Sequence, residues 1–66
     1  MVIRVNGQEE TLMEPFTLLE YLQHKGVNPA TVVIERNGEI PVRENWGKIA
    51  LVDGDALELV KFVGGG

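Results

Sequence analysis

The sequence of 66 residues ends on three glycines, Gly64, Gly65 and Gly66, and the carboxylate of the last is its most distinctive chemical group. Glycine loses more backbone freedom on ordering than any other residue, so a fold does not easily fix three in a row. The α-carbon of Gly66 carries no side chain, so a nucleophile can approach its carbonyl carbon once an oxygen has become a leaving group. We expect residues 64–66 to form a flexible tail with a reactive end; a tail without function is the alternative.

The other residue types offer little chemistry. There is no cysteine, which excludes a disulfide, a thiolate metal site and a thiol nucleophile, and a single histidine, His24, cannot hold a metal ion alone. The acidic pairs Glu9-Glu10 and Asp53-Asp55 fall in turn or hairpin sequence without a histidine partner. We therefore expect them to be solvated surface rather than general acids or metal ligands. The sequence predicts no metal site and no bound cofactor.

Composition excludes several classes of protein. Ten acidic and six basic residues give a net charge of −4, and the basic residues are scattered, which counts against nucleic-acid binding. No stretch approaches the ~20 apolar residues of a membrane helix, and "MVIRVNGQEE" lacks the features of a signal peptide. We expect a cytoplasmic protein with no membrane partner. A chain this short has no room for both a core and a deep catalytic cleft.

The first elements follow from local patterns. "MVIRVNG" alternates as a strand does, and Asn6-Gly7 is typical of a tight hairpin turn. A second, antiparallel strand is expected over Glu9–Met13, before Pro15. In "FTLLEYLQHKGV", Thr17 and Glu20 form a capping box, and Gly26 suits the left-handed position that ends a helix. The stripe expected to face the core is Leu18, Tyr21 and Leu22.

The second half reads as further strands. "TVVIERNGEIPV" predicts a strand over Thr31–Ile34, a turn at Asn37-Gly38, and an edge segment or brief strand at "EIPV". "RENW" predicts a single turn with Trp46 in the core. "KIALVDGDALELVKF" predicts a short strand, a turn and a longer last strand.

One hairpin, one helix and the later strands must bury one sheet face against one helix. We therefore predict the α+β class and a β-grasp (ubiquitin-like) roll, with a mixed sheet of four to five strands packed on one helix. The first and last strands of such a roll pair in parallel at the centre. The domain is expected to cover residues 1–63, followed by the tail.

The last predicted strand has two apolar faces. If Leu57 and Leu59 point inward, Val60 is out of phase and lies on the opposite face, as Val2 does on the first strand. Exposed apolar patches mark partner sites, so we interpret Val60 and Phe62 as a docking patch beside the tail; ordinary exposed surface is the alternative. The residues expected to bind partners are Val60, Phe62, Val63, Gly64 and Gly65.

These motifs resemble a known family. "NGEIPVRENW" followed by "VDGDALELVKFVGGG" is similar to the ThiS family of sulfur carriers of thiamine (thiazole) biosynthesis. The opening "VNG" and the helix "TLLEYL" extend the resemblance over the whole chain. The chain departs from the family at one step, because the family often has Val-Pro-Arg whereas Val42 here separates Pro41 from Arg43.

The resemblance implies a function for the terminus. In the family, an E1-like enzyme of ThiF type adenylates the terminal carboxylate, here that of Gly66, with ATP. The carboxylate then becomes a thiocarboxylate with sulfur derived from cysteine, and delivers that sulfur to a thiazole synthase of ThiG type. The chain would thus be a co-substrate, with ATP and the sulfur source used by the activating partner. Alternatives are the sulfur carrier subunit of molybdopterin synthesis, a ubiquitin-like protein modifier, and a binding module of TGS type.

Overall fold

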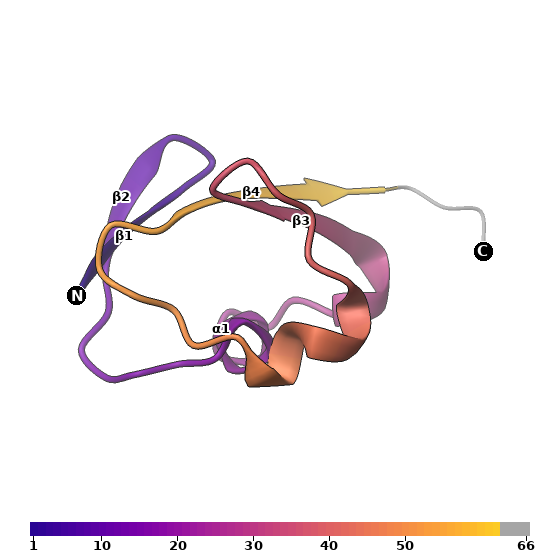
Figure 1. The fold of residues 1–66 in the computed structure, drawn as a ribbon, viewed down its shortest axis with the longest axis horizontal. Coiled ribbons are helices and arrows are strands. Elements are labelled where there is room, and N and C mark those ends of the chain that lie inside the picture. The colour runs from indigo at the N-terminus through magenta and orange to yellow at the C-terminus, as the bar shows by residue number, and fades with distance from the viewer. Residues whose placement is uncertain (63–66) are drawn as a thin grey trace.

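The structure is a computed structural model and describes residues 1–62. It contains one four-stranded sheet of order β2-β1-β4-β3, with α1 and two 3₁₀ helices, η1 and η2, on one side of it (Figure 1). The elements are β1 (Val2–Val5), β2 (Gln8–Thr11), α1 (Leu18–His24), η1 (Pro29–Thr31), β3 (Val32–Arg36), η2 (Arg43–Lys48) and β4 (Ala56–Lys61). Strands β1 and β4 pair in parallel at the centre, and the outer pairs are antiparallel. This confirms the predicted roll, with four strands.

The first hairpin turns at the predicted residues. Asn6 and Gly7 have φ angles of 52° and 83°, as a two-residue turn of this kind requires. Because the turn is so tight, pairing starts at Gln8; β1 begins at Val2, whose partner is Thr11, so β2 ends there and not at Met13 as the sequence predicted. Met13 lies beyond the ladder and is 89% exposed.

Helix α1 begins and ends as its local sequence dictates. The Thr17 hydroxyl accepts a hydrogen bond from the Glu20 amide (3.1 Å), and the Glu20 carboxylate accepts one from the Thr17 amide (2.8 Å). At the other end Gly26 has a φ of 72°, and the amide of Val27 reaches back to the Leu22 carbonyl (2.9 Å). This is the Schellman arrangement, and both predicted caps are confirmed.

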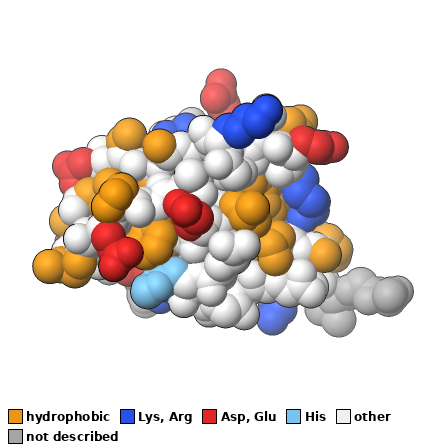
Figure 2. Space-filling model, turned by 90° about the horizontal axis from the view of Figure 1, so that it is seen from below, with side chains coloured by type: hydrophobic (Ala, Val, Ile, Leu, Met, Phe, Trp, Pro, Cys, Tyr) orange, Lys and Arg blue, Asp and Glu red, His pale blue; other side chains and the backbone are white. Residues whose placement is uncertain are grey.

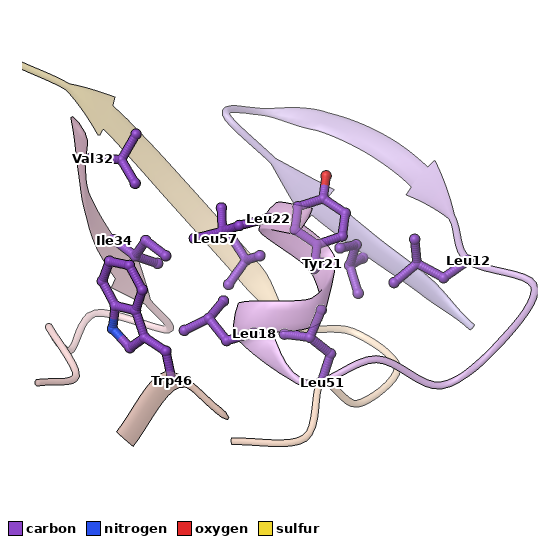
Figure 3. Close-up of a cluster of buried hydrophobic side chains, with 10 residues drawn as sticks. Leu12, Leu18, Tyr21, Leu22, Val32, Ile34, Trp46, Leu51 and Leu57 are labelled. Carbon is purple, nitrogen blue, oxygen red and sulfur yellow. The ribbon is translucent and has the colours of Figure 1, made fainter. Parts of the chain in front are cut away.

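The core lies between the sheet and α1 (Figure 3). Its buried hydrophobic side chains are Ile3, Leu12, Leu18, Tyr21, Leu22, Val32, Ile34, Trp46, Leu51 and Leu57. The predicted stripe of α1 and the predicted burial of Trp46 are confirmed. The Trp46 indole comes from η2, and its Nε1 donates to the Pro41 carbonyl at 3.2 Å.

Two further strands considered from the sequence do not form. The segment before Val52 pairs with the start of α1 and not with the sheet: the Leu18 amide donates to the Ile49 carbonyl (2.8 Å) and the Leu51 amide to the Phe16 carbonyl (2.9 Å). Leu51 is thereby buried under the helix. In "EIPV", a single bridge between Arg36 and Glu39 closes the Asn37-Gly38 turn.

Candidate functional site at the end of strand β4

Strand β4 leads directly to the predicted reactive end. β1 pairs with it in parallel at Ala56 and Leu57, β3 pairs with it in antiparallel fashion as far as Lys61, and the Phe62 amide still donates to the Thr31 carbonyl at 3.1 Å. The chain is therefore fixed by the sheet up to Phe62, four residues before Gly66. The other predicted site residues, Val63, Gly64, Gly65 and Gly66, lie outside the described residues.

The predicted orientation of Val60 and Phe62 is confirmed. Along β4, Leu57 is buried and Leu59 is half-buried on the helix side, whereas Val60 is 60% and Phe62 46% exposed. The register also brings Val33 of β3 opposite Val60, and Val33 is 39% exposed. We call Val33, Val60 and Phe62 the apolar trio.

Sequence reasoning missed Val33. A signal was available, because in a strand that buries its neighbours Val32 and Ile34 the residue between them must face the other way. The sequence did predict that Val2 lies on the same face as Val60, and Val2 is 40% exposed. However, Arg4 pairs with Ala56, which sets Val2 beside Gly54. Val2 therefore lies six residues from Val60 along the sheet, about 20 Å, and is not part of the trio.

The opposite side of the molecule has a different character. Seen from that side, hydrophobic side chains form separate groups interrupted by acidic and other polar surface (Figure 2). A hollow of about 370 Å³ is lined by Arg36, Glu39, Ile40, Pro41 and Ile49. It contains no residue of β4.

The prediction that Asp55 is solvated surface is wrong. Its side chain is 2% exposed, and one oxygen accepts hydrogen bonds from the Arg36 guanidinium (3.1 Å) and the Val52 amide (2.9 Å). The other oxygen accepts from the Asn37 side chain at 2.9 Å. Burial by itself raises the pKa of Asp55, but the bonds from Val52, Asn37 and Arg36 outweigh it and hold the pKa below its usual value. The carboxylate is a structural anchor.

The prediction of solvated surface holds for only one residue of the pair Glu9-Glu10. Glu9 is exposed as predicted and lies 3.6 Å from Arg4. Glu10 is half-buried, accepts a hydrogen bond from the Tyr21 hydroxyl (2.9 Å) and pairs with Lys25 (3.2 Å). Burial, reinforced by Glu10, raises the pKa of the Tyr21 hydroxyl. Both contacts tie β2 to α1.

The remaining candidates have structural roles. His24 is exposed as predicted, with its ring 4.9 Å from that of Phe16. Arg43 lies over the Trp46 ring (4.7 Å to the centroid) and donates to the carbonyls of Pro29 and Val32, which covers part of the free edge of β3. Within residues 1–62 no three acidic or histidine side chains are grouped so as to hold a metal ion. Nor does this part of the chain contain a helix with the length and apolar content to cross a membrane.

Comparison with known proteins places these features in a family. Residues 3–66 match the model of the ThiS family. The sulfur carrier protein ThiS of Bacillus subtilis is 32% identical over 66 residues, covering 98% of this chain and all of that protein. A thiazole synthase of Paramagnetospirillum magneticum is 38% identical over 66 residues, and this chain spans 20% of its length. The crystal structure of a thiamine biosynthesis protein (ThiS) from Geobacter metallireducens has a TM-score of 0.85 at 36% identity, with both chains fully covered.

Within residues 1–62, the mixed sheet, the single α-helix and the central position of β4 define a small β-grasp protein of the ubiquitin-like kind. The chain belongs to the ThiS family. This membership confirms the resemblance seen in the sequence and supports a role as a sulfur carrier in thiamine biosynthesis.

Proposed function

We propose that this chain carries sulfur on its own terminus and is used up as a co-substrate. An E1-like enzyme of ThiF type adenylates the Gly66 carboxylate, the adenylate is converted to a thiocarboxylate, and a ThiG-type thiazole synthase takes the sulfur. The observation that carries the proposal is the family match, which extends through residue 66 and so includes all three terminal glycines.

The chemistry needs only one group of the chain, the terminal carboxylate. A carboxylate oxygen of Gly66 attacks the α-phosphorus of ATP, and pyrophosphate leaves. Hydrosulfide delivered by the activating partner then attacks the carbonyl carbon, AMP leaves with the electrons of the carbon–oxygen bond, and loss of the S–H proton leaves the thiocarboxylate. ATP and the sulfur source belong to the activating partner, and glycine at this position leaves the carbonyl carbon unobstructed.

The sheet supports this role by holding the tail on a rigid base. Strand β4 pairs with β1 at Ala56 and Leu57 and with β3 as far as Lys61, so a partner that binds the open face would hold the end of this strand in place. Val60 and Phe62 are the proposed docking residues on the body, and Val63, Gly64 and Gly65 the proposed contacts along the tail. An exposed apolar group of this kind next to a reactive end is typical of a partner site.

The thiazole synthase partnership draws support from a relative. A protein named thiazole synthase in Paramagnetospirillum magneticum contains a stretch similar to this entire chain. A carrier and a synthase that act in sequence gain from being close together, because proximity raises their effective concentration.

Intact-mass measurement tests the proposal. After incubation with ATP, a ThiF-type enzyme and a sulfur source, the chain should gain roughly 16 Da, the difference between sulfur and oxygen in an acyl-transfer product. A variant lacking residues 64–66 ends on Val63, whose branched side chain crowds the carbonyl carbon, and should gain no mass yet melt at the same temperature, since the buried core residues lie between Ile3 and Leu57. A mass gain in the shortened variant would contradict the proposal, and linkage of the chain to other proteins would point to a modifier.

A further inference from the structure

The open face of β3 and β4 carries two kinds of side chain in adjacent rows. The register sets Val33 opposite Val60 and, one step along the same face, Glu35 opposite Glu58. Helix α1 and η2 lie on the other side of the sheet, so no element of the described chain covers this face (Figure 1). The apolar trio and the two glutamates are all exposed.

The two glutamates form an unfavourable pair. The Asn37 amide donates to the Ala56 carbonyl, so by alternation Glu35 and Glu58 also occupy a hydrogen-bonded pair of the antiparallel ladder. The Cα atoms of such pairs are about 5.5 Å apart. Like charges placed directly opposite one another destabilise a sheet. The fold thus keeps a repulsion on a surface that it leaves open.

No cation within residues 1–62 pairs with these two carboxylates. Arg4 shares the face, but its guanidinium lies 3.6 Å from Glu9 on the far side of β1. Lys61 pairs with Val32, whose side chain is buried, and therefore projects on the opposite face from Glu58. The salt bridges found in this part of the chain are Arg4–Glu9, Lys25–Glu10 and Arg36–Asp55.

We infer that this face docks on a partner surface that presents an arginine beside apolar side chains. The guanidinium bridges Glu35 and Glu58 and relieves their repulsion, while the apolar trio packs against the neighbouring side chains. Arginine fits better than lysine, because its planar fork can donate to two carboxylates at once. The inference rests on the proposed function, and it assigns this surface to the ThiF-type activating enzyme.

Glu35 and Glu58 also restrict which partner surfaces can bind to this face. A partner whose matching surface is acidic or wholly apolar would bury two unpaired carboxylates, which costs far more than an apolar mismatch. The apolar trio alone would accept many hydrophobic surfaces. The two glutamates therefore restrict docking to a basic one and make the association sensitive to salt.

The test is a set of binding isotherms with a purified ThiF-type enzyme at low and high salt. Glu35→Gln/Glu58→Gln should weaken binding at least about tenfold and flatten its salt dependence. The control, Glu14→Gln/Glu44→Gln, removes the same charge from exposed positions away from the open face and should bind nearly as the unaltered chain does. Val60→Asn/Phe62→Asn should also weaken binding.

Thermal melts separate docking from folding. Removing a repulsive pair should leave the melting temperature of Glu35→Gln/Glu58→Gln unchanged or higher. If Glu35→Gln/Glu58→Gln and the control Glu14→Gln/Glu44→Gln lost affinity equally and only slightly, the inference would be overturned, because net charge alone would then explain the effect. If the unaltered chain itself neither bound nor was adenylated, the proposed function would fall and the docking surface with it.

Discussion

Asp55 ties three segments together through one carboxylate. Its partners come from the end of β3 (Arg36), the turn that follows it (Asn37) and the loop before β4 (Val52). Every contact is a hydrogen bond from a donor to a charged acceptor, and such bonds are stronger than neutral ones. A buried charge with this many donors stabilises the fold only while it remains ionised.

We predict that Asp55→Asn destabilises the protein by about 2–3 kcal/mol near neutral pH. This is less than for a fully buried pair, because the Arg36 side chain is 27% exposed and can still reach water. The folded pKa of Asp55 lies below its unfolded value, so its contribution is present above about pH 4 and is lost as pH falls through the folded pKa. Urea unfolding at steps from pH 7 to about pH 2 should show the two proteins converging in acid.

The matched control is Asp53→Asn in the same turn. Asp53 is exposed, and its carboxylate accepts one backbone hydrogen bond, from Val2 at 2.7 Å. Its loss should cost about 1 kcal/mol or less. If Asp55→Asn were no more harmful than Asp53→Asn, the anchoring role given to Asp55 would be wrong.

Among the elements, helix α1 shows how one residue sets a boundary. Gly26 has a φ of 72°, and a Cβ built on it would meet no atom within 4 Å. Gly26→Ala should therefore destabilise through backbone strain alone, by about 1 kcal/mol. In the control Gly47→Ala, φ is not positive and the nearest atom is 3.6 Å away, on Leu19, so a change within about 0.5 kcal/mol is expected. Thermal melts of both variants give the comparison, and equal effects would exclude the strain argument.

Elements governed by local rules could be predicted, and those governed by distant partners could not. The Asn6-Gly7 turn and both ends of α1 depend on residues at most a few positions apart, which the sequence displays. The segment at Ile49 has the composition of a strand, yet it pairs with the start of α1, some 30 residues earlier. Burial of Asp55 likewise depends on Arg36, 19 positions away.

The same distinction between local and distant determinants applies to the candidate site. Alternation along β4 was enough to put Val60 and Phe62 on the open face. The glutamate pair could not be predicted from alternation, since it requires the β3–β4 register that brings Glu35 opposite Glu58. A one-residue slip of β3 along β4 would have sent Glu35 to the other face, away from Glu58.

At the scale of the molecule, the central strands β1 and β4 join the first and last parts of the described chain. The Arg4 amide donates to the Asp55 carbonyl (2.8 Å) and the Asn6 amide to the Leu57 carbonyl (2.9 Å), across about 50 residues of sequence. These bonds can break only when β1 and β4 separate, which also opens the core. The strand that leads to the proposed reactive end is thus the one whose loss unfolds the protein.

This arrangement predicts the pattern of native-state hydrogen exchange. The amides of Arg4 and Asn6 should exchange only through global unfolding, and should be among the slowest. Strand β2 is an edge: Met1 and Leu12 exchange both of their backbone hydrogen bonds (2.8 and 3.0 Å), so by alternation the amides of Glu9 and Thr11 point away from β1. Those amides should exchange orders of magnitude faster, as amide-resolved NMR exchange would show. Protection at Glu9 and Thr11 equal to that at Arg4 would mean that another strand covers this edge in solution.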